Sequence, residues 1–160
     1  MNDRQAIIET CDRTGWHSDR REWDRATALF TPKVLLDYTS LLGGTPTTVT
    51  PKEIVDSWAS VLGGYDSSHH LMTNHLVTTD EGGDGAECTA SFQATHRLDN
   101  PMGSPLWRIG GTYRFHLVRH GGGWKIDRMA MTILWTEGNR NILDLAAERQ
   151  AATGEEHHGS

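Results

Sequence analysis

The sequence AECTASFQATHRL, residues 86–98, alternates small or apolar residues with polar ones. Residues two apart in a β-strand point to the same side of a sheet, so this alternation predicts a strand with one buried face and one exposed face. The expected buried set is Cys88, Ala90, Phe92, Ala94, His96 and Leu98. His96 therefore falls on the buried face, whereas Arg97 and Asp99 fall on the solvent face.

The downstream segments continue this pattern. Strands are expected over 106–119 and 124–135, separated by turns rich in Gly, Asp and Pro. The inward face of the first carries Trp107, Ile109, Gly111, Tyr113, Phe115 and Leu117. The inward face of the second carries Met129, Met131, Ile133 and Trp135. His116 lies on the opposite, outward face.

The upstream strand, expected over 69–79, leaves one choice open. One face carries His70, Met72, Asn74 and Leu76, and the other carries His69, Leu71, Thr73, His75 and Val77. Neither face is clearly apolar, so alternation does not decide between His69 and His70. With the three later strands this segment predicts an antiparallel meander.

The N-terminal part has helical periodicity instead. We expect one helix from about Asp3 to about Gly15 and a second from about Asp19 to the Thr31-Pro32 step. A short strand over 34–39 then places Tyr38 on its apolar face.

A third helix is marked by its start signal. The sequence TPKE, residues 50–53, combines a capping box with proline at the first helical position, and Gly63-Gly64 ends the apolar pattern that follows. A last helix is expected near 142–150.

Helices followed by a long curved sheet make an α+β fold. We expect a single domain over residues 1–150 and a polar tail without regular structure over 151–160. A strongly twisted sheet that rolls around a helix encloses one pocket on its concave side. The inward side chains of the strands then decide the function.

Composition narrows the class of function. The chain has 160 residues and a net charge of −6, from 15 Lys and Arg against 21 Asp and Glu. This balance disfavours a nucleic-acid or anionic-membrane partner. Two cysteines, Cys11 and Cys88, are too few for a disulfide scaffold and indicate reduced thiols. The start has no signal-peptide pattern and no segment is apolar enough for a membrane span, so we expect a soluble, cytoplasmic protein.

Five short motifs lie in the expected order along the chain. They are DRREWDR (19–25), DYTSL (37–41), HHLMTN (69–74), THR (95–97) and GWKI (123–126). Together they resemble the SnoaL-like branch of the nuclear transport factor two-like superfamily, and within it the scytalone dehydratases, from about residue 5 to about residue 138.

The resemblance implies a cone-shaped α+β barrel with a deep pocket between the sheet and the N-terminal helices. Asp19 matches the aspartate that orients a catalytic histidine, and His96 matches that histidine. His70 matches a second pocket histidine, which resolves the choice between His69 and His70. Tyr38 matches a tyrosine that holds a water on the substrate carbonyl.

The sequence also departs from that family pattern. Ser18 stands where the family has its other water-holding tyrosine, and Gly111 and Tyr113 stand where it has a serine and an asparagine. We therefore expect similar acid–base chemistry on a different compound.

An imidazole paired with a carboxylate can remove a proton next to a carbonyl. We expect the Asp19–His96 pair to do so, and Tyr38, His70 or Tyr113 to stabilise the resulting enolate. Returning the proton to a departing hydroxyl gives dehydration, and returning it to carbon gives isomerisation or ring closure. This scheme needs no metal or organic cofactor, and the histidines lack a paired ligand spacing such as H-x-x-x-H.

The expected substrate is a small hydroxylated carbonyl compound, such as a polyketide or aromatic precursor. The residues expected to bind it are Tyr113, Trp107, Phe92, Phe115, Asn74, Met131 and Trp135. Aromatic and sulfur-containing walls suit a flat, mostly apolar ligand. A homo-oligomer, a dimer or trimer, is also expected.

Three alternatives stay open. His96 can be a core histidine satisfied by backbone or a hydroxyl. The domain can bind a small molecule or associate with a partner without catalysis. Epoxide hydrolysis would use an arginine flanked by aspartates, for which Arg97 and Asp99 have a suitable spacing but lie on the face opposite His96.

Overall fold

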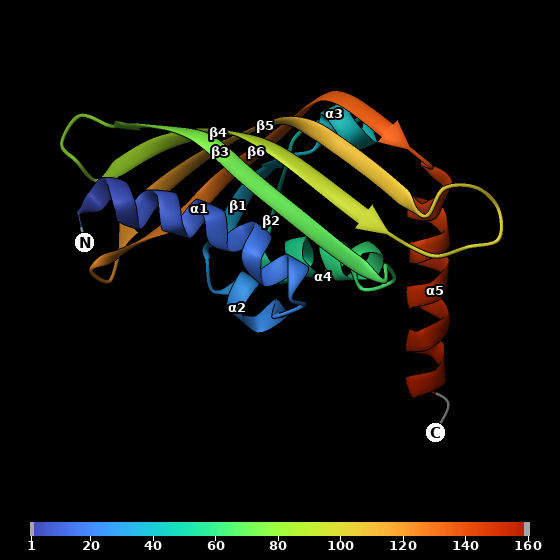
Figure 1. Cartoon of the computed structure of the whole chain (residues 1–160). Helices are drawn as coiled ribbons and strands as arrows, with labels where there is room; N and C mark the ends of the chain where they lie inside the picture. The colour runs from blue at the N-terminus through green and yellow to red at the C-terminus, as the bar shows by residue number, and fades with distance from the viewer. Residues whose placement is uncertain (1, 159–160) are drawn as a thin grey trace.

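Six strands form one strongly curved sheet in the computed structural model, which describes residues 2–158 (Figure 1). The strands are β1 (Phe30–Asp37), β2 (Thr47–Val49), β3 (Ser67–Thr79), β4 (Gly85–Arg97), β5 (Leu106–His120) and β6 (Gly123–Gly138). Their order is β2-β1-β6-β5-β4-β3. β3 to β6 form the predicted antiparallel meander, and β1 pairs parallel to β6. The sheet is open, with β2 and β3 at its edges.

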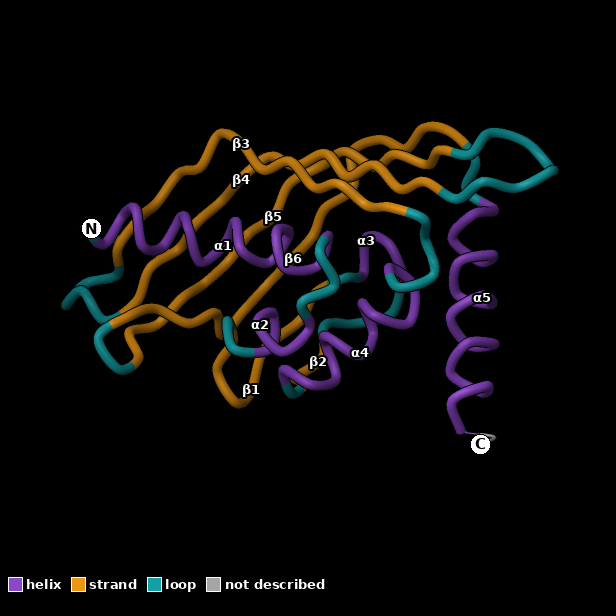
Figure 2. The backbone as a smooth tube through the Cα atoms, turned by 60° about the horizontal axis from the view of Figure 1, so that its bottom comes forward, coloured by secondary structure: helices purple, strands orange, loops and turns teal. Residues whose placement is uncertain are grey.

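Five described helices accompany this sheet. The first, second and fourth lie on its concave side, and the last stands at one end of it (Figures 1 and 2). The helices are α1 (Asp3–Asp19), α2 (Trp23–Thr27), α3 (Thr39–Leu42), α4 (Pro51–Leu62) and α5 (Asn141–His158). The α+β class and the cone-like arrangement are therefore as expected. The capping box at α4 is present, since the Thr50 hydroxyl accepts from the Glu53 backbone N–H at 3.2 Å. None of the described helices has the length and apolar character needed to cross a bilayer.

The N-terminal helix boundaries differ from the prediction. α1 begins after an Asn2 cap and continues through Gly15, because Gly15 packs against β3, where an added Cβ would lie 3.0 Å from the His70 Cβ. The second helix is short and Phe30 already belongs to β1, whose entry is fixed by the Ile126 N–H donating to the Leu29 carbonyl at 2.9 Å. α3 and β2 were not predicted.

The C-terminal helix is also longer than expected. α5 continues to residue 158, beyond the predicted end at Gln150 and through most of the segment 151–160 that we expected to lack regular structure. Its alanine-rich sequence has high helix propensity, which explains the extension. Residues 159 and 160 lie outside the described residues.

The buried faces of β4 and β5 are confirmed. All six residues of the set beginning at Cys88, and all six of the set beginning at Trp107, are buried. On β6, Met129 and Met131 are 2% and 6% exposed. The core thus lies between the concave face and the helices that cover it.

Trp135 is the exception, and its inward placement was wrong. The β5–β6 register shifts by one residue between the pairs Gly110–Trp135 and Gly111–Ile133. Such a bulge reverses the faces of the residues beyond it. The Trp135 ring consequently lies over Gly110 on the outer face, with the Arg108 guanidinium 5.7 Å from its centroid.

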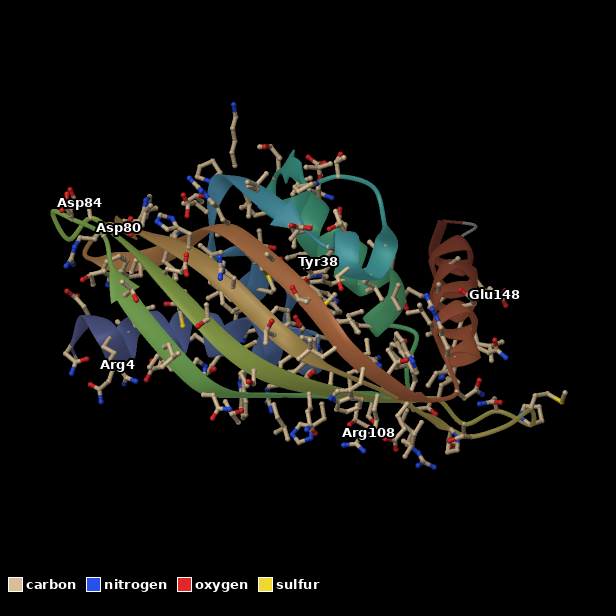
Figure 3. All side chains as sticks on the ribbon, turned by 90° about the horizontal axis from the view of Figure 1, so that it is seen from above. Arg4, Tyr38, Asp80, Asp84, Arg108 and Glu148 are labelled. Carbon is tan, nitrogen blue, oxygen red and sulfur yellow. The ribbon has the colours of Figure 1, made fainter. Side chains whose placement is uncertain are left out.

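A charged clamp holds the end of the sheet opposite α5. His116 Nδ1 lies 2.6 Å from Asp127 Oδ1, and His116 Nε2 lies 2.9 Å from Asp80 Oδ2, in the region where Figure 3 labels Asp80. Burial lowers the pKa of His116, but the hydrogen bonds to the two carboxylates outweigh it and the net pKa is raised. Both ring nitrogens therefore donate, and the charged form is favoured.

The raised pKa of His116 makes its contribution to stability pH-dependent. The contribution is complete below the unfolded-state pKa of about 6.5 and is lost as the pH rises through the folded-state pKa. We predict that His116→Gln lowers the free energy of unfolding by roughly 1 kcal/mol at about pH 5.5, and by less at about pH 9. Urea unfolding at both pH values tests this, with His120→Gln, an exposed position in the same strand, as the control. An equal loss at both pH values would contradict the clamp.

Candidate active site

A cavity of about 310 Å³ lies between the concave face of the sheet and helices α1, α4 and α5. Its volume is at the lower end of the range for small-molecule pockets. The walls are mostly aromatic and aliphatic, and include Phe92, Ala94, Trp107, Ile109, Met129 and Met131. The principal polar side chains are Tyr38, Tyr65, His70, His96, Tyr113 and Asp144. The cavity is therefore apolar with a few polar groups, as a ligand site requires.

Asp19, the last residue of α1, holds His70 of β3 at two points. Asp19 Oδ1 lies 2.5 Å from His70 Nδ1, and Asp19 Oδ2 accepts from the His70 backbone N–H at 2.7 Å. The two side chains are only 14% and 12% exposed. A carboxylate accepts hydrogen bonds, so Nδ1 carries the proton and Nε2 is the ring nitrogen left for another partner.

The expected pairing of Asp19 with His96 was wrong. The end of α1 packs on the edge strand β3, so the carboxylate meets His70 before it can reach β4. The two imidazoles are nevertheless neighbours, with ring centroids 5.7 Å apart in an edge arrangement. The family resemblance thus grouped three residues that do lie together in the structure, but it paired Asp19 with the other histidine.

His96 is 4% exposed and is held by uncharged groups. Its Nδ1 lies 2.7 Å from Ser68 Oγ, and its ring stacks on Tyr65 at a centroid distance of 4.6 Å. Burial, aided by repulsion from His70 and opposed by attraction to Asp19, lowers the pKa of His96 to about 3. His96 is thus neutral at physiological pH.

Two tyrosines of the predicted set line the cavity. Tyr38 lies where β1 gives way to α3 (Figure 3), and its hydroxyl accepts from Trp58 Nε1 at 3.2 Å. Tyr113 is 6% exposed and stacks on Phe92 at 4.2 Å. Burial raises the pKa of both phenols, so both keep their protons at neutral pH. Tyr113 is a potential hydrogen-bond donor to a ligand.

The other expected binding residues divide into two groups. Phe92, Trp107 and Met131 line the cavity. Phe115 is fully buried but belongs to the core beyond the cavity lining, and Trp135 lies on the outer face.

Asn74 also lies outside the cavity lining, and the reason is a second bulge. Thr73 pairs with Ser91 and Leu76 with Thr89, so β3 contains one extra residue there. Asn74 occupies it with φ of 58°, a conformation that asparagine tolerates, and its amide reaches Ser91 Oγ at 3.5 Å. Alternation alone does not reveal such an insertion.

Several cavity residues were missed in the sequence. Tyr65 follows the Gly63-Gly64 helix stop and its hydroxyl is buried without a hydrogen-bond partner in the described structure. Trp58 of α4 and Asp144 of α5 come from helices whose inward faces were not assigned. The apolar spacing that includes Trp58 was the available signal for α4.

The positions of the side chains do not support an epoxide-hydrolase site or a metal site in the described residues. Arg97 and Asp99 form a mutual ion pair at 2.7 Å, with side chains 47% and 70% exposed, and neither lines the cavity. This is not the pocket arrangement that epoxide hydrolysis needs. Within the described part of the chain, no three His, Cys, Asp or Glu side chains converge as a metal site would require.

The sequence matches a family model described as the SnoaL-like domain over residues 1–130. The chain belongs to the SnoaL-like domain family. This confirms the family resemblance. A comparison with curated protein sequences found no match.

Solved structures with the same fold agree with this membership. Kfla4162 from Kribbella flavida is 29% identical, with a TM-score of 0.80 over 90% of this chain and 96% of its own. A proposed aromatic ring hydroxylase from Novosphingobium aromaticivorans is 27% identical, with a TM-score of 0.75 over the same shares, 90% and 96%. A proposed scytalone dehydratase from the same organism is 18% identical, with a TM-score of 0.73 over 85% and 87%. A sequence identity of 18% to this dehydratase-named structure is evidence of a shared fold only. The same holds for structures named as dehydrochlorinases, one of which is 17% identical.

The lowered pKa of His96 gives a direct prediction for this site. Between about pH 5 and about pH 8 the ¹⁵N chemical shifts of the His96 ring should stay those of a neutral imidazole, because burial disfavours the charged form. Below the unfolded-state pKa of about 6.5, only the unfolded chain takes up this proton, so acidification should destabilise the fold through His96. Histidine-selective NMR checks the shifts, and a titration midpoint near 6.5 for His96 would contradict the burial argument.

Proposed function

We propose that the protein is a cofactor-independent lyase of the dehydratase type, or an isomerase or cyclase, with His70 as the general base. Its substrate is a small hydroxylated carbonyl compound of the polyketide or aromatic-precursor class. The observation that carries the proposal is the two-point hold of Asp19 on His70 at the wall of an apolar cavity.

The two hydrogen bonds between Asp19 and His70 support a general base with a defined ring orientation. Because Asp19 takes the Nδ1 proton, Nε2 of His70 is the nitrogen available to remove a proton from a substrate carbon. The imidazolium formed in that step is stabilised by the adjacent carboxylate. A well-placed base contributes roughly 10²–10⁴ in rate, so other groups must supply the remainder.

Tyr113 and His96 are the groups proposed to stabilise the enolate. Tyr113 keeps its proton because burial raises its pKa, and it therefore donates to the developing oxyanion. His96 is neutral, so it adds a hydrogen-bonding ring nitrogen without competing for the substrate proton. Tyr38 shares its hydroxyl with Trp58 and is proposed to orient a water or the substrate oxygen.

In the dehydration version, His70 removes the proton at the carbon next to the carbonyl and the electron pair forms an enolate. Collapse of the enolate breaks the bond to the β-hydroxyl, which leaves as water with the proton returned by His70. The product is an unsaturated ketone and the base is regenerated. Reprotonation at carbon instead gives isomerisation.

The solved structures that share this fold support a lyase class of activity but do not identify a substrate. The SnoaL-like fold is shared with structures named as dehydratases and dehydrochlorinases. Both names describe eliminations, a reaction class in which a base removes a proton from carbon and a neighbouring group leaves. Assembly as a dimer or trimer and location in the cytoplasm stay predictions.

Dehydration of 3-hydroxy-1-tetralone to 1-naphthol tests the proposal, because the product absorbs strongly and forms only after proton abstraction beside the carbonyl. We predict that His70→Gln lowers kcat by roughly 10²–10⁴ and that Asp19→Asn lowers it by roughly 10–10². Steady-state kinetics on folded, ligand-competent variants measure both effects.

Asp12→Asn is the matched control. Asp12 lies on the same helix and makes a similar contact, 2.7 Å from His75 Nε2, but it does not line the cavity. Its kcat should equal that of the wild type. If the wild type binds ring ketones tightly but does not turn them over, the non-catalytic binding domain is favoured instead. If His70→Gln keeps the kcat of the wild type, as Asp12→Asn should, His70 is not the base.

A further inference from the structure

The cavity lining carries few charged side chains. Among the lining residues that the structure describes, none is Lys or Arg, and Asp144 is the one carboxylate. A ligand anion in this cavity would have no cationic side chain to replace its hydration. Transferring an unpaired anion into apolar surroundings is strongly unfavourable.

The titratable groups of the cavity do not supply the missing positive charge. The pKa of His96 is lowered to about 3 by burial, and any charge on His70 is matched by Asp19 at 2.5 Å. Burial keeps the phenols of Tyr38, Tyr65 and Tyr113 protonated by raising the pKa of each. At neutral pH the wall thus has no unpaired cation.

Asp144 lies at the rim of the cavity, in the first turn of α5. It is exposed and makes no ion pair with any side chain in the described range. α5 itself is fixed: an added Cβ on Gly64 would lie 1.8 Å from the Ala146 carbonyl oxygen, and Arg149 donates to Asp66 at 2.7 Å. The part of the backbone that carries Asp144 is therefore fixed beside the cavity.

We propose that this cavity selects uncharged ring compounds, and that Asp144 is the specificity-determining residue that repels anions at its rim. The inference rests on the proposed function only in taking this cavity as the substrate site. It narrows the substrate class to compounds that bring no carboxylate or phosphate group into the cavity. α5, which carries Asp144, lies outside the residues 1–130 that the family model matches.

A pair of fluorescent probes that differ by one sulfonate tests the proposal. The probes are 1-anilinonaphthalene, which is uncharged, and 8-anilinonaphthalene-1-sulfonate. Fluorescence titration should show the uncharged probe binding at least about tenfold more tightly than the sulfonate. Ala147→Trp, which fills the α5 end of the cavity, should weaken binding of the uncharged probe and so locate it.

Asp144→Asn should reduce the ratio of the two dissociation constants by about three- to tenfold, mainly through tighter binding of the sulfonate. The matched control is Glu148→Gln, which removes an exposed acid from the same helix outside the cavity lining (Figure 3) and should leave the ratio unchanged.

Equal or tighter binding of the sulfonate by the wild type would overturn the proposal, as would failure of the uncharged probe to bind. An unchanged ratio in Asp144→Asn, or an equal change in Glu148→Gln, would remove the role of Asp144. Because the readout is binding, the same titrations in His70→Gln separate this inference from the proposed catalysis: discrimination should persist there although turnover is lost.

Discussion

The carboxylate of Asp19 bonded to both the ring and the backbone of His70 is the contact on which the site depends. It joins the end of α1 to the edge strand β3 and fixes the tautomer of the ring that faces the cavity. Seven residues earlier on the same helix, Asp12 makes a second contact of this kind with His75. Seven residues are about two helical turns, so both aspartates lie on one face of α1.

The two histidines of β3 that meet these aspartates must lie on the same face of the strand, and a bulge makes this possible. His70 and His75 are five residues apart and would face opposite sides of a regular strand. The extra residue at Asn74 returns His75 to the face of His70. Gly15, between the two aspartates, lets the helix approach β3 closely. Helix, bulge and glycine together place the dyad. The two cavity histidines then differ in their partners, since His70 is bound to a carboxylate and His96 to the Ser68 hydroxyl.

Much of this arrangement follows from local patterns in the sequence. The alternation of residues 86–98 predicted the buried position of His96, and the capping box predicted α4. Both depend on interactions between residues near in sequence, which a pattern captures. The family motifs added Asp19, His70 and Tyr38, all of which contribute to the site region.

The failures share a different cause. Trp135 and Asn74 were misplaced because a single inserted residue reverses the faces of a strand, and hydrophobic alternation does not mark an insertion. The partner of Asp19 was misassigned because it depends on which strand lies at the sheet edge, a property of the whole topology. Asp144 reaches the cavity only through the packing of α5 beside α4, which is a contact between segments far apart in the sequence.

The most direct test of this account is the protonation state of His70 in protein labelled with ¹⁵N at histidine. The account predicts the Nδ1–H, Nε2-unprotonated tautomer, with a strongly downfield Nδ1–H resonance that disappears in Asp19→Asn. An Nε2–H tautomer, or an Nδ1–H resonance that is unchanged by Asp19→Asn, would contradict it.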